Sequence, residues 1–195
     1  MKLSEKKILR KKEQILSSAI EIINKKGYSG ATMEEIAAEL LMTKGSLYYY
    51  FKNKSDLMYQ CHQFVLSKAT EEMEKILDIK EETAQDLLTK MIAAHMEYAI
   101  EEKEVFNLIM EPKRTFSEEQ LSLVLKLRKN YENLFHQVII RGVANGEFSV
   151  KEPAIARMIM LGAMNWVQQW YKPNGRLNKE ELAAIYTEYI LKMLH

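Results

Sequence analysis

The chain has 195 residues, 47% hydrophobic and 28% charged with a net charge of +1, a composition typical of globular proteins that excludes a disordered chain. The single cysteine, Cys61, excludes an internal disulfide and favours a reducing compartment. The most apolar stretch, residues 155–167, contains Arg157 and is shorter than the roughly 18 residues that a membrane span needs, so we expect a cytoplasmic protein without a membrane partner.

Three helices are predicted in the first 52 residues, over residues 4–26, 33–40 and 43–51. Gly27 ends the first helix, because glycine commonly follows the last helical turn. The sequence TMEE at residues 32–35 is a capping box that begins the second, and Thr43 caps the third. Two short helices joined by a tight turn are typical of a helix-turn-helix unit.

Five longer helices are predicted in the remainder, over residues 53–78, 83–102, 117–146, 153–171 and 178–195, with a short helix over residues 105–110. Most of them begin at a capping residue, and Pro153 suits a first helical turn. No segment needs to be a strand. The predicted fold is therefore all-α with about nine helices: a three-helix domain at residues 1–52 and a helical bundle at residues 53–195.

The stretch TKGSLYYYFKNKSDL, residues 43–57, carries three adjacent tyrosines. On a helix, Leu47 and Phe51 share one face and are predicted to be core. The opposite arc carries Gly45, Ser46 and Tyr49. Tyrosine hydroxyls can donate to phosphate oxygens, and their rings can contact sugars or thymine methyl groups. The alternative is that the rings only pack helices together and the nearby lysines are solvated.

Basic residues are concentrated near the N-terminus. Residues 1–60 carry 11 Lys and Arg against 7 Asp and Glu, a net charge of +4, whereas the remainder has a net charge of −3. This asymmetry indicates a polyanion partner for the first 60 residues only. The run before the motif is either a solvated helix face or a contact to phosphate or the minor groove, and it comprises Lys6, Lys7, Arg10, Lys11 and Lys12.

The block from Ile15 to Leu57 resembles the TetR family of bacterial transcriptional repressors, through GYSGATMEEIAAEL and TKGSLYYYFKNKSDL. The resemblance implies a homodimer whose three N-terminal helices bind double-stranded operator DNA and whose larger domain binds a small effector. It also implies DNA contacts at Thr32, Thr43, Lys44, Gly45, Ser46, Tyr48, Tyr49 and Lys54. Leu41 departs from the family pattern, which usually has glycine at this turn, and it implies either a different turn or strain.

Methionine and aromatic residues of the larger domain favour an apolar effector. The candidate effector-binding residues are Met91, His95, Phe106, Met110, Phe135, Met164, Trp166 and Trp170, each of which could instead be plain core. The stretch GAMNWVQQWYKPNG is similar to a pattern in the branch of the family that senses acyl-CoA thioesters. Apolar residues nearly all round the helix at 153–171 favour pairing of a homodimer through this helix and the last one, with core packing as the alternative.

We therefore predict a ligand-responsive repressor without cofactor, metal or catalytic residues. The four histidines, at positions 62, 95, 136 and 195, show no metal-binding spacing, and no nucleophile, Walker or dinucleotide motif is present. Two alternatives stay open at this point. One is a helical protein–protein adaptor without a DNA role, and the other is a small all-helical enzyme acting on lipid thioesters.

Overall fold

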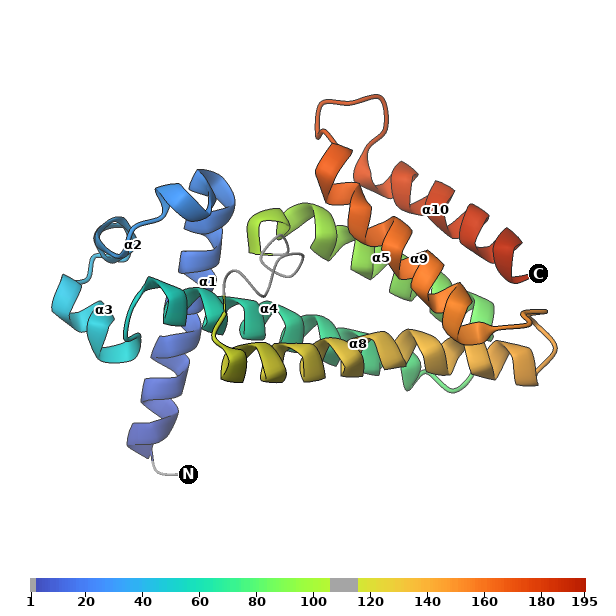
Figure 1. Ribbon diagram of the computed structural model, residues 1–195, viewed down its shortest axis with the longest axis horizontal. Coiled ribbons are helices and arrows are strands. Elements are labelled where there is room, and N and C mark those ends of the chain that lie inside the picture. Colours follow the sequence, from blue (N-terminus) through green and yellow to red (C-terminus); the bar gives the residue numbers. More distant parts are fainter. Residues whose placement is uncertain (1–2, 106–115) are drawn as a thin grey trace. The chain divides into compact units, whose positions relative to one another are not determined.

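The computed structural model describes residues 3–105 and 116–195, and the described part is all-α, as predicted (Figure 1). Its helices, in chain order, are α1 (Leu3–Gly30), α2 (Met33–Glu39), α3 (Lys44–Tyr50), α4 (Lys54–Leu77), α5 (Ala84–Glu101), α8 (Glu118–Ala144), α9 (Pro153–Trp170) and α10 (Lys179–Leu194). Most of the short helix expected at residues 105–110 lies outside the described residues. No described helix is both long and apolar enough to cross a membrane.

The predicted caps are present, which explains why these helices begin where they do. At α2, the Glu35 amide donates to Thr32 Oγ1 at 3.1 Å, and the Thr32 amide donates to the Glu35 carboxylate at 3.0 Å. Asn178 and Glu181 form the same reciprocal pair at the start of α10. Each cap satisfies amide groups that the first helical turn leaves without partners.

Gly27 breaks the first helix as predicted, although a further helical turn follows it. Its φ of 75° and ψ of 165° are not helical, and the helix continues beyond it to Gly30. The φ lies in the region that glycine enters without steric cost. The break directs residues 28–30 towards the start of α2.

The described chain divides into two compact units: unit 1 comprises Met1–Leu66 with Glu102–Leu125, and unit 2 comprises Ser67–Glu101 with Lys126–His195. The domain boundary expected between residues 52 and 53 stays a prediction. The core of unit 1 joins α1, α2, α3 and the first part of α4, through the fully buried side chains Ile15, Ile23, Ile36, Leu47, Phe51 and Leu57.

Unit 2 is built around α5, which packs against both α9 and α10 (Figure 1). The last two helices run antiparallel and are joined through the KPNG turn at residues 172–175, as predicted. The core shared by α5, α9 and α10 consists of buried apolar side chains that include Leu87, Leu88, Met91, Met160, Met164, Val167 and Ile190.

Candidate DNA-binding surface and buried polar cluster

Helix α3 presents the two faces that the sequence predicts. Leu47 and Phe51 are fully buried in unit 1, whereas the Tyr49 side chain is 72% exposed. The Tyr50 ring lies next to the Phe51 ring on one side and meets the Tyr49 ring edge-on at the other, with the Tyr49 and Tyr50 ring centroids 5.1 Å apart. One tyrosine therefore supports the packing of this helix, while Tyr48 and Tyr49 remain available to a partner.

The two candidate threonines lie at helix caps, where their hydroxyl groups fix the first turns. Thr43 Oγ1 accepts from the Ser46 amide at 3.1 Å and lies 2.8 Å from the Ser46 hydroxyl oxygen. Thr32 holds the corresponding place at α2. Both threonines are exposed, and Thr43 lines the same hollow as Gly45 and Tyr49.

Lys44, the first residue of α3, forms an ion pair with Glu34 of α2. Its ammonium group also lies 5.7 Å from the centroid of the Tyr48 ring. The hydrogen bond from Lys44 holds the pKa of the Glu34 carboxyl below its ordinary value, and the same bond raises the pKa of Lys44. Because an ammonium group has three donors, Lys44 can keep this acid partner while it contacts phosphate or a base.

The Lys54 side chain is held by contacts with Tyr28 that the sequence does not indicate. Its ammonium group donates to the backbone carbonyl oxygen of Tyr28 and lies 4.4 Å from the centroid of the Tyr28 ring. A cation over an exposed aromatic ring contributes about 0.5–1 kcal/mol. Lys54 thus ties the beginning of α4 to the turn after Gly27, a contact between residues 26 positions apart that no local pattern indicates.

A hollow of about 810 Å³ opens on unit 1 between the N-terminal half of α1 and α3. It is lined by Lys11, Leu41, Met42, Thr43, Gly45, Ser46, Tyr49 and Tyr50. Four of the eight candidate DNA contacts line it, and Lys11 comes from the basic run before the motif. A methyl group added at Gly45 would meet nothing within 4 Å, so packing within the chain does not require glycine there.

Leu41 adopts the left-handed conformation that glycine usually supplies. Its φ is 51°, and its amide donates to the Ala38 carbonyl at 3.0 Å. The Met42 amide donates to the Ala37 carbonyl at 2.8 Å, which completes the usual two-bond ending of a helix. The sequence leaves open either a different turn or a strained one. The structure keeps the ordinary turn with Leu41 in the left-handed conformation, which costs about 1–2 kcal/mol for a residue with a side chain.

Unit 2 contains a buried polar cluster centred on His95 of α5. Its Nδ1 lies 2.9 Å from the Tyr131 hydroxyl, and its Nε2 lies 3.1 Å from Asn165 Oδ1. Because an amide oxygen only accepts, Nε2 carries the proton and Nδ1 accepts from Tyr131. Burial lowers the pKa of His95 to about 4, so the imidazole is neutral at physiological pH.

Gln168 of α9 adds a second polar side chain near this cluster. It is 1% exposed, and its Nε2 donates to the backbone carbonyl oxygen of Asn165 at 3.3 Å. Its Oε1 has no hydrogen-bond partner among the described residues. The sequence does not predict a role for Tyr131, Asn165 or Gln168. The polar residues at positions 165 and 168 of a largely apolar helix are a signal for the last two, and no comparable signal marks Tyr131.

The candidate effector-binding residues are only partly brought together. Phe135 meets the His95 ring edge-on at 5.8 Å, and both Met91 and Met164 are buried in the same unit. Phe106 and Met110 lie outside the described residues. Trp166 and Trp170 do not lie in this core, because their side chains are 59% and 46% exposed.

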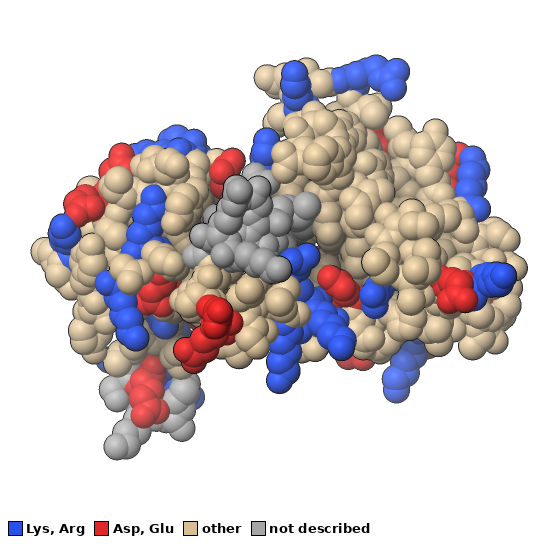
Figure 2. Space-filling model, in the orientation of Figure 1, with Lys and Arg blue, Asp and Glu red and all other residues tan. Residues whose placement is uncertain are grey.

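The exposed face of α9 is strongly apolar. Its side chains are Ile155, Met158, Ile159, Trp166 and Trp170, and α10 adds Tyr189 and Met193. Figure 2 shows a broad area without charged side chains over α9. A continuous exposed apolar area of this kind is typical of an interface between proteins.

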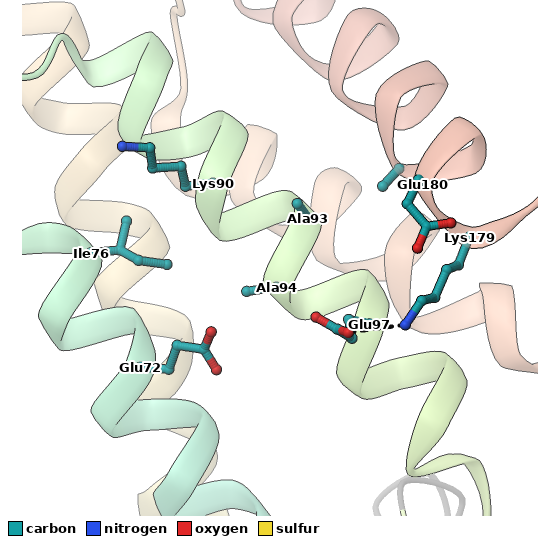
Figure 3. A pocket seen from close by; sticks show the side chains of 9 residues that line it. Glu72, Ile76, Lys90, Ala93, Ala94, Glu97, Lys179 and Glu180 are labelled. Carbon is teal, nitrogen blue, oxygen red and sulfur yellow. Dashed lines mark hydrogen bonds and ion pairs between the residues drawn. The ribbon is translucent and has the colours of Figure 1, made fainter.

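A groove of about 390 Å³ lies elsewhere on unit 2, between α4, α5 and α10 (Figure 3). Lys179 reaches across it, with Nζ 3.0 Å from the Glu97 carboxylate and a second bond to Glu101. These bonds, the one to Glu101 first, raise the pKa of Lys179. Lys90, which also lines the groove, is likewise paired with Glu82.

Among the described residues, no three His, Cys, Asp or Glu side chains gather into a possible metal site.

Two family models match the chain. Residues 15–61 match the model described as "Bacterial regulatory proteins, tetR family", and residues 81–194 match "Tetracyclin repressor-like, C-terminal domain". The first match contains α2, α3 and the beginning of α4. The second covers more than half of the chain and contains the buried polar cluster.

Similar proteins of known name are regulators. The fatty acid metabolism regulator protein of Bacillus subtilis is 25% identical over 187 residues, which cover 93% of this chain and 94% of that protein. The transcriptional repressor KstR2 of Mycolicibacterium smegmatis is 26% identical over 184 residues, with 93% and 89% covered.

Solved structures agree with this fold. The TetR family regulator PfmR from Thermus thermophilus is 27% identical with a TM-score of 0.79, covering 91% of this chain and 97% of that one. AibR, solved with isovaleryl coenzyme A and operator DNA, has a TM-score of 0.75 over 94% of this chain and 97% of that chain. At 23% identity, the likeness to AibR concerns the fold alone.

Proposed function

Because this chain belongs to the tetR family of bacterial regulatory proteins, we propose that it is a homodimeric repressor that a small apolar effector releases from its operator. Family membership makes it a helix-turn-helix transcriptional regulator and not an enzyme, which is at odds with both alternatives considered from the sequence. Its place of action is the cytoplasm, where bacterial DNA lies.

The outward surface of α2 and α3 carries the DNA-binding proposal. Leu47 and Phe51 hold α3 in the core, so Gly45 and Tyr49 face a partner. Gly45, Ser46 and Lys44 contact base edges, and Tyr48, Tyr49, Lys54 and the threonines contact phosphates. In a dimer, two such helices enter successive major grooves about 34–36 Å apart, on a near-palindromic site.

Dimerisation is supported by the exposed apolar face of α9 and α10. Ile155, Ile159 and Trp166 would be poorly placed in water in a lone chain. Pairing this face with its copy about a two-fold axis removes these side chains from water on both chains. Analytical ultracentrifugation tests the proposal: Ile159→Glu converts the dimer into a monomer, whereas an unchanged dimer contradicts this interface.

The effector proposal rests on the core around His95. Met91, Phe135 and Met164 supply apolar surface, and the neutral His95 supplies a polar centre. Acyl-CoA thioesters combine an apolar chain with polar groups, and relatives of this chain include a fatty acid metabolism regulator. The effector can release the operator only by binding more tightly to the dimer state that does not fit the DNA.

Selection of bound duplexes from a random-sequence library tests the proposal as a whole. The wild-type protein is expected to enrich a near-palindrome, and fatty acyl-CoAs are expected to release it while raising the melting temperature. Failure to enrich any sequence contradicts operator binding. Enrichment without stabilisation by any thioester contradicts only the acyl-CoA assignment.

A further inference from the structure

Leu41 is the most exposed large apolar residue of the described chain, with 96% of its surface accessible. It is also the one described residue other than glycine with a positive φ, at 51°. The conformation is unfavourable for a leucine, and the exposed side chain gains almost no packing in return. The folded chain therefore gains nothing from a leucine at this position, and glycine would serve the turn better.

Its location supplies a reason for the leucine. Leu41 lines the same hollow as Thr43, Gly45 and Tyr49, so its side chain continues the surface proposed to face DNA. A leucine side chain has no hydrogen-bond donor or acceptor, so its partner must be apolar. On duplex DNA, the apolar features within reach of such a surface are deoxyribose carbons and the 5-methyl group of thymine.

We propose that Leu41 is a DNA-contacting residue whose side chain packs against a deoxyribose or a thymine methyl group of the operator. The proposal rests on the operator binding proposed above and adds an aliphatic contact to the contacts proposed for the hydroxyl groups, the lysines and Gly45 of the same surface. Strained residues are often found at functional sites, and here the strain places an apolar group where the fold has no use for it.

The test uses the full-length dimer and a duplex selected by the wild-type protein from a random library. Leu41→Gly and Leu41→Asn both suit the left-handed turn, and both remove the apolar side chain. Each is expected to bind the duplex about five-fold more weakly, at a melting temperature equal to or above that of the wild type. Leu41→Met, which keeps an apolar side chain, retains wild-type affinity within about two-fold.

The salt dependence separates this contact from a phosphate contact. Because Leu41 neutralises no phosphate, the slope of log affinity against log salt stays at its wild-type value in all three variants. Leu123→Ala, which removes an exposed leucine of α8 that does not line the hollow, is the matched control and leaves affinity unchanged.

Substitution of deoxyuridine for thymine in the duplex distinguishes the two DNA groups. If the partner is a thymine methyl group, removing that methyl weakens the wild type but not Leu41→Gly; if it is a sugar, both proteins respond alike. Wild-type affinity in Leu41→Gly and Leu41→Asn overturns the proposal. A wild-type protein that selects no duplex overturns operator binding itself.

Discussion

The ammonium group of Lys54 lies 4.4 Å from the centroid of the Tyr28 ring and also donates to the Tyr28 carbonyl oxygen. This pair joins the first residue of α4 to the end of α1. Lys54 therefore has a structural role in unit 1 in addition to its proposed contact with phosphate.

Replacement of Lys54 separates these two roles. Lys54→Met keeps the aliphatic stem and is expected to lower the free energy of unfolding by about 0.5–1 kcal/mol, measured by urea denaturation. If Lys54 also binds phosphate, the slope of log affinity against log salt falls by about one. Tyr28→Phe keeps the ring and the carbonyl, so its stability stays at the wild-type value; unchanged stability in Lys54→Met contradicts the structural role.

Glu34 is expected to weaken DNA binding. It holds Lys44 in an ion pair on the proposed DNA-facing surface, and its negative charge repels phosphate. Glu34→Gln therefore binds duplex DNA several-fold more tightly at low salt, and the gain shrinks as salt screens it. Glu188→Gln breaks a similarly exposed pair with Lys192 in unit 2 and is the control. Weaker binding by Glu34→Gln is the contrary result and would assign Glu34 a direct contact with a base.

At position 45, fold stability favours alanine, whereas the proposed DNA contact favours glycine. A methyl group at this position meets nothing in the chain, and alanine favours a helix over glycine by about 0.8–1 kcal/mol. Gly45→Ala is therefore expected to melt at a higher temperature and to bind the selected operator more weakly, because the methyl group separates the helix from the DNA. A variant that is more stable and binds equally well removes Gly45 from the contact surface.

His95 makes stability depend on pH. Its folded pKa of about 4 lies below its ordinary value of 6.5, so between these values the unfolded chain binds more protons than the folded one. The folded state therefore loses stability as pH falls from about 6.5 to 4, by an amount on the order of 3 kcal/mol. The measurement is the free energy of unfolding against pH for wild type and His95→Gln, which lacks this loss. His195→Gln replaces an exposed histidine and is the control, which is expected to follow the wild-type curve. If the free energy of unfolding of His95→Gln falls with pH as steeply as that of the wild type, His95 is not the source of the loss.

The features that the sequence predicts correctly depend on short separations. The Thr32–Glu35 capping box lies within three residues, and the burial of Leu47 and Phe51 follows from helical periodicity. The contacts that it does not indicate join distant segments, as in the 70-residue separation of His95 and Asn165. Such pairs depend on how helices pack together, which a single sequence does not reveal.

Leu41 and the tryptophans of α9 are two further features that the sequence alone does not explain. The sequence indicates an unusual residue at position 41, but only the backbone shows that the ordinary turn is kept under strain. Trp166 and Trp170 belong to an apolar helix, and periodicity alone does not separate its core face from a face that another chain could cover. The proposed roles of these residues therefore depend on assembly and DNA binding.

The affinity of Tyr49→Ala for the selected operator, measured by fluorescence anisotropy beside its melting temperature, tests the proposed DNA-facing surface most directly. Tyr49 is 72% exposed, so its loss leaves the fold and the dimer intact. A hydrogen bond to a charged phosphate contributes about 1.5–3 kcal/mol, so the variant is expected to bind at least about ten-fold more weakly. Wild-type affinity in a folded, dimeric Tyr49→Ala protein would contradict the claim that this surface of α3 meets duplex DNA.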